Sequence, residues 1–354
     1  MRCSSFPPRI ERRMIRFVLA LVLFCTAVRA QPFAWGVNGH PVSQEGYWQV
    51  PLTTQLDWVK ELGAGWYRCD ISAASFQAST ARIDELLAEA EKRGIRLLPV
   101  LVPGAELMDE KTSLPQLQVA ATEFARAIVS RYQGRITHWE LGNELDLYAL
   151  IRKGETTRGG KRWEWDGAPD GSSADDYHQG RYERARVYIQ GLQEGVKNAD
   201  LAALTLVDTA GWLHHGFIER LVKEDRVPFD ILAWHWYSEM GDMTKVRGTL
   251  DLIALLKGHG KPLWITEINR RDGSKGGQEQ EAADYLAATA KQLRKHPAVE
   301  AFFVYELLDE PYFGTDGESD YGLVKISREG GSGWKVSGKK PAFEKLREVI
   351  QSQK

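Results

Sequence analysis

Eight short apolar runs alternate with amphipathic stretches along most of this 354-residue chain, and this alternation limits the possible folds more than any other feature. Few polar positions interrupt the runs, which is typical of strands that are buried on both faces of a parallel sheet. The expected strands are Phe33–Val37, Gly65–Cys69, Arg96–Val102, Ile136–Leu141, Leu204–Val207, Ile231–Trp236, Pro262–Thr266 and Ala301–Tyr305.

Helical stretches with recognisable ends lie between these runs. In Ser79–Arg93 the apolar residues recur at helical spacing, and Gly94 follows as a C-terminal stop. Similar patterns predict helices at Leu114–Tyr132, Met243–His259, Gln278–His296 and Pro341–Gln351. Eight strands that alternate with helices predict an α/β fold, and their number favours a closed (β/α)8 TIM barrel in a single domain. An open doubly wound sheet is the alternative, but no glycine-rich phosphate motif follows the first strand.

Two long segments follow expected strands without a clear pattern of their own. Leu145–Ala174 follows the fourth strand, and the next helix is expected to begin near Asp175. Asp309–Gly338 follows the eighth strand. Loops of this length without secondary structure are uncommon and often form lids or binding loops. Because loops after the strands build the active face of a (β/α)8 barrel, both segments are expected at its mouth.

The first thirty residues are predicted to be a signal peptide. Arginines precede the apolar stretch Phe17–Val28, and Val28-Arg29-Ala30 is an acceptable cleavage site, with Met14 as an alternative start. The stretch is shorter than the about 20 residues that a membrane-spanning helix needs. Cleavage would leave Cys69 as the one cysteine of the mature chain, without a disulfide. Residues 31–354 are therefore expected to form one mature domain that is secreted or periplasmic in a bacterium, and not membrane-bound.

The composition excludes some classes of partner and favours another. The 46 basic and 48 acidic residues give a formal net charge of −2, which gives no reason to expect nucleic acid. The twelve tryptophans are large flat surfaces that suit the apolar faces of sugar rings, although each of them could equally belong to the core. The sequence has no Gly-x-Ser-x-Gly, Walker, His-Glu-x-x-His or Cys-x-x-Cys motif, so other chemistry has little support.

Two glutamates stand where expected strands give way to loops. Glu144 ends the motif Leu141-Gly-Asn-Glu, and Glu267 ends the motif Ile265-Thr-Glu. The two are far apart in sequence, but the ends of barrel strands meet at one mouth. Paired carboxylates in one cleft are what glycosidic bond cleavage requires. One such glutamate could form a structural ion pair; two, on the fourth and seventh runs, favour catalysis.

These motifs resemble the acid/base and nucleophile motifs of the clan A glycoside hydrolases, closest to family 39 and its bacterial exopolysaccharide-cleaving relatives, with family 5 next. The resemblance extends over about Trp35 to Phe343. It implies a retaining β-glycoside hydrolase that works by double displacement on a β-glycan or exopolysaccharide, with Glu144 as acid/base and Glu267 as nucleophile. It implies no metal and no organic cofactor. The alternatives are a transglycosylase with the same two carboxylates and a non-catalytic carbohydrate-binding barrel.

The resemblance also implies roles for residues near the two glutamates. Arg68 resembles the arginine that braces the nucleophile, and Asn143 resembles the asparagine that binds the sugar 2-hydroxyl. His235 and Tyr237 resemble a His-x-Tyr element in which the tyrosine bonds to the nucleophile and the histidine lines the cleft. Tyr305 or Glu306 stands in the neighbourhood where the clan usually places a tryptophan.

Four more residues are candidates for substrate binding because of their positions. Asn38 and His40 come just past the first strand and are expected to face the cleft, with a role in a turn as the alternative. Trp163 and Trp165 lie in the long loop after the fourth strand, where exposed tryptophans often mark a binding surface. Basic residues of the same loop would favour an anionic sugar if they overhang the cleft, and otherwise belong to a solvated loop.

Overall fold

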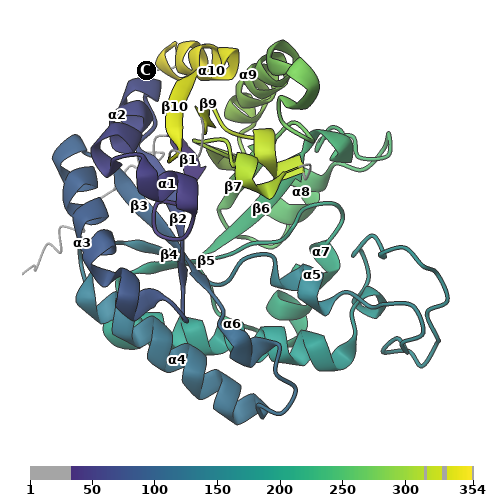
Figure 1. Cartoon of the computed structure of the whole chain (residues 1–354). Helices are drawn as coiled ribbons and strands as arrows, with labels where there is room; N and C mark the ends of the chain where they lie inside the picture. The colour runs from purple at the N-terminus through teal and green to yellow at the C-terminus, as the bar shows by residue number, and fades with distance from the viewer. Residues whose placement is uncertain (1–32, 315–316, 329–332, 353–354) are drawn as a thin grey trace, which may run out of the picture. The chain divides into compact units, whose positions relative to one another are not determined.

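The computed structural model describes residues 33–314, 317–328 and 333–352. The expected signal peptide lies outside these residues, so export stays a prediction. Eight parallel strands close into a barrel in chain order, with β8 paired to β1 (Figure 1). Their bounds are β1 Ala34–Gly39, β2 Trp66–Ser72, β3 Arg96–Val102, β4 His138–Glu140, β5 Leu204–Val207, β6 Ile231–Tyr237, β7 Leu263–Asn269 and β8 Val299–Val304.

Helices surround the barrel, so the predicted (β/α)8 architecture is confirmed (Figure 1). The helices are α1 Glu45–Gln49, α2 Leu52–Leu62, α3 Phe76–Arg93, α4 Leu114–Arg131, α5 Leu145–Ala149, α6 Gln179–Ala199, α7 His215–Glu219, α8 Leu252–Lys257, α9 Glu279–Lys295 and α10 Pro341–Gln351. None of these described helices has the length and hydropathy to cross a membrane.

The two long segments after β4 and β8 contain more structure than the sequence indicated. The segment after β4 begins with the short helix α5, and α6 starts at Gln179 after a single 3-10 turn at Ala174–Asp176. The segment after β8 carries an antiparallel pair of strands, β9 Val324–Ser327 and β10 Lys335–Lys339. Only parts of these segments are therefore irregular.

The helix predicted at Met243–His259 is wrong over its first half. The backbone turns at Arg247 and Gly248, where φ is 52° and 83°, values that lie outside the helical region. The helix α8 begins only after Asp251, whose carboxylate accepts a hydrogen bond from the backbone N–H of Ala254. Asp251 thus caps α8, and the apolar residues before it belong to a turn.

The side chains inside the barrel form two layers, an apolar one and, nearer the C-terminal ends of the strands, a polar and charged one. Trp66, Trp264 and Phe303 pack ring against ring in the lower layer. Gly36 makes room for them, because a Cβ atom there would lie 2.1 Å from the Phe303 ring. The layer above is made of buried polar side chains: Asn38, Arg68, Glu140, Asp208, His235, Thr266 and Glu267. Trp66 and Arg68 are two positions apart on β2, so both side chains point into the barrel.

Candidate active site

A pocket of about 770 Å³ opens at the C-terminal ends of the barrel strands. Most of the predicted site residues line it: Asn38, His40, Arg68, Asn143, Glu144, Tyr237, Glu267 and Tyr305. His235 is fully buried beside the pocket and contacts both glutamates. The structure therefore brings together side chains from β1, β2, β6, β7 and the segments after β4 and β8.

Glu267 reaches this pocket because β7 carries a β-bulge. Ile265 of β7 pairs with Trp234 of β6, but the next pair is Glu267 with His235, which leaves Thr266 as an extra residue. In a regular strand two successive side chains point to opposite faces. A bulge changes that direction, and here Thr266 bonds to buried Glu140 while Glu267 also faces the pocket.

The surroundings of Glu267 favour its ionised form. Arg68 Nη1 donates a hydrogen bond of 2.7 Å to Oε1, and the Tyr237 hydroxyl donates one of 2.8 Å to Oε2. Burial alone would raise the pKa of Glu267, but the positive charges of His235 and Arg68 outweigh it and hold the pKa below the usual range. A carboxylate fixed by two donors and ionised at neutral pH is suited to nucleophilic attack.

Glu144 occupies a backbone conformation that few residues other than glycine adopt. Its φ and ψ are 49° and 42°, and Gly142, two residues earlier, has φ of 92°. The left-handed region is unfavourable for a residue with a side chain, so something must hold it. The Glu144 backbone N–H donates a hydrogen bond of 2.7 Å to the carboxylate of Asp208, at the end of β5. Asp208 thus fixes the turn that aims Glu144.

Glu144 and Glu267 share one partner, His235. The Nδ1 atom of His235 lies 2.7 Å from Oε1 of Glu144 and 3.6 Å from Oε2 of Glu267. One carboxylate oxygen of each glutamate lies within 4.8 Å of the other. Burial raises the pKa of Glu144 above its ordinary value, in the direction opposite to Glu267. Two like residues are thereby placed in unlike states, as an acid and a nucleophile require.

Arg68 connects the floor of the pocket. Beyond Glu267, its Nε donates to Glu140 at 2.5 Å, Nη1 to Asn38 at 2.8 Å and Nη2 to Asn143 at 2.8 Å. The side chain is 5% exposed, so these bonds lie away from bulk water. The planar guanidinium of Arg68 therefore fixes the positions of Asn38, Asn143 and the Glu267 carboxylate.

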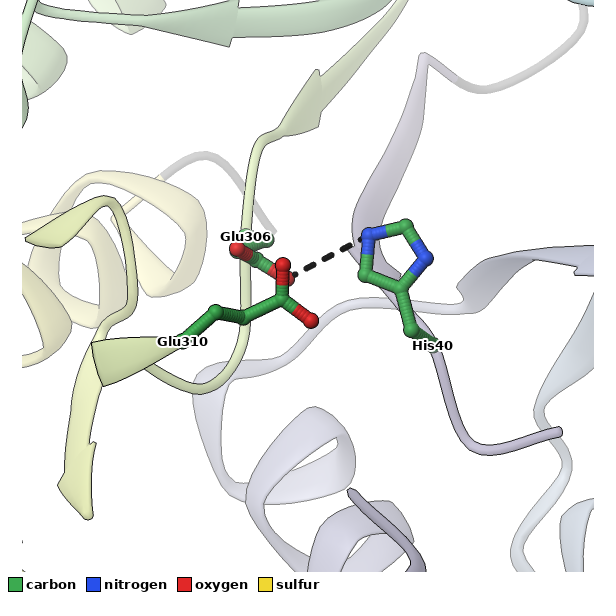
Figure 2. Close-up of side chains that lie close together, drawn as sticks. All are labelled: His40, Glu306 and Glu310. Carbon is green, nitrogen blue, oxygen red and sulfur yellow. Dashed lines mark ion pairs between the residues drawn. The ribbon is translucent and has the colours of Figure 1, made fainter. Parts of the chain in front are cut away.

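One wall of the pocket is a histidine surrounded by carboxyl groups. His40 places Nδ1 2.7 Å from Asp70 and Nε2 3.4 Å from Glu306. Figure 2 shows Glu306 and Glu310, from the segment after β8, reaching toward His40. Burial would lower the pKa of His40, but Asp70 and Glu306 together raise it to about 10, so the ring carries a positive charge at neutral pH. The hydroxyl of Tyr305 lies 3.3 Å from Nε2.

Three groups among the described residues have the donor types and spacing to hold a metal ion. They are His40 with Glu306 and Glu310, Glu140 with Asp208 and His235, and Glu144 with His235 and Glu267. Each group already contains or touches a positively charged side chain. In the first group this is His40, and in the other two it is His235 together with Arg68. The pKa of His235 is raised to about 9. A second positive charge there would meet repulsion, so the groups are explained as charge networks.

Residues 183–320 match the family model described as glycosyl hydrolase catalytic core. This match covers less than half of the chain. The matched part contains β5 to β8, with His235, Tyr237 and Glu267, and Glu144 lies before it. A search of curated proteins gives no match.

Solved structures share the fold of this chain over most of its length. A family 39 glycoside hydrolase from the gut symbiont Bacteroides cellulosilyticus WH2 is 17% identical, with a TM-score of 0.64 over 90% of this chain and 63% of that one. The chain thus spans less than two thirds of that enzyme. A family 1 β-glucosidase from Thermotoga maritima is 13% identical, with a TM-score of 0.65 over 91% and 98% of the two chains. The partial family match agrees with the expected resemblance to glycoside hydrolases, and these solved structures show that the fold is shared.

Trp163 and Trp165 lie outside the pocket of the two glutamates. They line a neighbouring pocket of about 630 Å³, which shares Leu147 and Trp212 with the first. Several of the basic residues of the same loop are neutralised by acidic neighbours. The pairs are Lys153 with Asp166, Arg158 with Glu224 and Arg162 with Glu164.

Sequence reasoning missed three residues that shape the site. Glu140 and Asp208 are buried carboxyl groups below Glu144, and Trp212 stands at the pocket mouth. Asp208 directly follows β5, so a search for polar residues at the end of every predicted strand could have found it. Glu140 directly precedes the motif that ends at Glu144. No pattern around Trp212 distinguishes it from the other tryptophans of the sequence.

Proposed function

We propose that the protein is a retaining β-glycoside hydrolase that acts on a poly- or oligosaccharide by double displacement. The observation that carries this proposal is the closeness of Glu144 and Glu267, with oxygens within 4.8 Å, combined with their opposite pKa shifts. Retaining glycosidases hold their carboxyl groups about 5–5.5 Å apart, whereas inverting ones leave about 6.5–9.5 Å for a water molecule. The short separation supports retention.

In the first step, Glu267 attacks the anomeric carbon as that carbon loses its bond to the glycosidic oxygen. Glu144 gives its proton to this oxygen, so the leaving group departs as an alcohol and a glycosyl ester of Glu267 remains. In the second step, Glu144 takes a proton from water, the water oxygen attacks the anomeric carbon, and the ester bond breaks. Arg68 and Tyr237 keep the Glu267 carboxylate oriented through both steps.

The substrate is a carbohydrate, and β-linkage is supported by the likeness to a β-glucosidase and by the motif resemblance. Asn143 is held by Arg68 beside the two glutamates, a position that suits contact with the sugar 2-hydroxyl. We also propose that the enzyme works after export, because its first thirty residues have the pattern of a signal peptide.

The proposal is tested with a panel of aryl β-glycosides and several purified β-glycans and exopolysaccharides. Wild-type protein is expected to release products from at least one member of the panel. Glu267→Gln should abolish this release, whereas the control Glu123→Gln, at an exposed position of α4, should leave it unchanged. Tight glycan binding without cleavage over days would contradict the proposal and favour a binding protein.

The pH dependence of kcat/KM follows from the two pKa shifts. Activity needs ionised Glu267, whose lowered pKa places the acid limb below the ordinary glutamate value of 4.5. It also needs protonated Glu144, whose raised pKa places the alkaline limb above 4.5. The expected profile is therefore bell-shaped. Glu144→Gln, assayed on a dinitrophenyl glycoside whose departure needs no acid, should lose the alkaline limb. A profile of this variant with an unmoved alkaline limb would assign that limb to another group.

A further inference from the structure

Trp212 lies between three pockets of the surface. It lines the pocket of the two glutamates, the pocket with Trp163 and Trp165, and a third pocket of about 660 Å³. Its side chain is 44% exposed although indole is a large apolar surface. A tryptophan in this position adds little to the core, so its presence needs another explanation.

The backbone holds Trp212 at the mouth at an energetic cost. Its φ of 46° lies in the left-handed region, which is unfavourable for a residue with a bulky side chain. Gly211 before it has φ of 89°, and a Cβ there would lie 2.2 Å from the carbonyl oxygen of His235. The tight packing of Gly211 against β6 therefore fixes where the indole of Trp212 points. Strained residues that stay exposed are frequent at ligand sites.

Trp163 and Trp165 extend this aromatic surface from the loop after α5, which projects from the barrel rim in Figure 1. Their ring centroids are 6.3 Å apart, and Trp165 is 61% exposed. The indole N–H of Trp163 is buried and has no hydrogen-bond partner within the described part of the chain. Since a buried donor without a partner is unfavourable, a ligand hydroxyl that reached this N–H would gain a hydrogen bond.

Charged side chains around this pocket already have partners. Arg247 lies 2.9 Å from Asp170, and Asp176 accepts a hydrogen bond from the backbone N–H of Ser173. A charged ligand would have to compete with these pairs. An uncharged sugar ring, with apolar faces for indole and hydroxyl groups for the free N–H, fits the pocket better.

The pocket adjoins the side of the cleft that holds the proposed acid. Leu147, which lines both pockets, is on α5, the helix that starts immediately after Glu144. Trp212 lies on the same segment as Asp208, whose carboxylate accepts the hydrogen bond from the Glu144 backbone N–H. Glu144 protonates the glycosidic oxygen, and the leaving group is attached to that oxygen. We therefore infer that the leaving group lies on the side of the cleft lined by Leu147 and Trp212.

We propose that Trp212, Trp163 and Trp165 form a binding subsite for an uncharged sugar unit on the leaving-group side of the cleaved bond. This inference rests on the proposed function, because Glu144 defines that side. The subsite makes a sugar chain, rather than a sugar with a small aglycone, the preferred substrate. Bonds inside a chain are then cleaved better than those of a simple glycoside.

The test compares an oligosaccharide with an aryl glycoside that carries the same sugar at the cleaved bond. Trp165→Ala should lower kcat/KM for the oligosaccharide about 10-fold more than for the aryl glycoside, which corresponds to the loss of one aromatic contact. Trp212→Ala should act in the same direction. The control Trp48→Ala, at a 48% exposed position of α1, should lower neither value. Equal losses on both substrates, or no loss on either, would overturn the subsite.

A second measurement separates failure of this inference from failure of the proposed function. Binding of neutral β-linked oligosaccharides is measured by titration calorimetry with Glu267→Gln as the parent protein, so that cleavage plays no part. Adding Trp165→Ala should weaken binding about 10-fold. If wild type cleaves nothing but this loss is seen, the proposed function fails and the aromatic sugar site stands. Unchanged binding, or stronger binding of a uronic acid oligomer than of the neutral ones, would overturn the inference.

Discussion

Replacing Glu267 with alanine is expected to lower kcat by about 10⁴-fold or more, because a group that forms the covalent intermediate has no substitute in the site. Azide should partly restore turnover. The two donors that hold the carboxylate, Arg68 Nη1 and the Tyr237 hydroxyl, remain in place after the substitution and face the space that it leaves. They can hold a small anion there, on the face of the sugar from which Glu267 would attack.

The configuration of the rescued product identifies the role of Glu267. Azide bound in place of the nucleophile displaces the leaving group once, so a β-glycoside should give an α-glycosyl azide, which NMR distinguishes from the β form. Glu123→Ala serves as the control and should need no rescue. A β-glycosyl azide from Glu267→Ala would instead mean that this residue is the acid/base.

Replacing Glu144 with alanine should give the opposite pattern. Loss of a general acid lowers rates by about 10²–10⁴-fold for leaving groups that need a proton. Dinitrophenyl leaving groups need none, so formation of the intermediate should be much less affected for them. Without a base to activate water, the intermediate should accumulate and appear as a burst. Azide, which needs no base, should accelerate its breakdown and yield a β-glycosyl azide.

Two controls complete the test of Glu144. Glu306→Ala removes another buried carboxyl near the pocket wall, and it should not give a β-glycosyl azide. The melting temperature of Glu144→Ala should remain close to that of wild type, because the backbone hydrogen bond to Asp208 does not involve the removed side chain. Equal losses on dinitrophenyl and unactivated substrates, without an azide product, would contradict the role of Glu144 as acid/base.

The barrel could be predicted because buried parallel strands leave a simple pattern. Arg96–Val102 and Leu204–Val207 were predicted with the bounds that β3 and β5 have in the structure. The prediction failed where tertiary contacts or a turn override a helical pattern, as before α8. The helices α1 and α2 were not predicted, although Leu52, Leu56, Val59 and Leu62 of α2 are buried at helical spacing.

The site was partly predictable because its polar residues lie in or just after the expected strands. Glu144 and Glu267 follow apolar runs, Arg68 lies near the end of another, and the closed barrel brings such positions to one mouth. The orientation of these side chains could not be predicted. It depends on an extra residue in β7 and on the hydrogen bond from the Glu144 backbone to Asp208, and both are set by pairing across distant strands. For the same reason, the separate pocket of Trp163 and Trp165 could not be predicted from the sequence.

The most direct measurement of the central claim is the anomeric configuration of the first product, followed by proton NMR during hydrolysis of a β-glycoside. Glu144 and Glu267 are close enough to act on one anomeric centre without a water molecule between them. Two displacements at that centre predict that the β-anomer appears first and later equilibrates with the α-anomer. Initial release of the α-anomer would mean a single displacement by water, and it would contradict the assignment of Glu267 as a nucleophile.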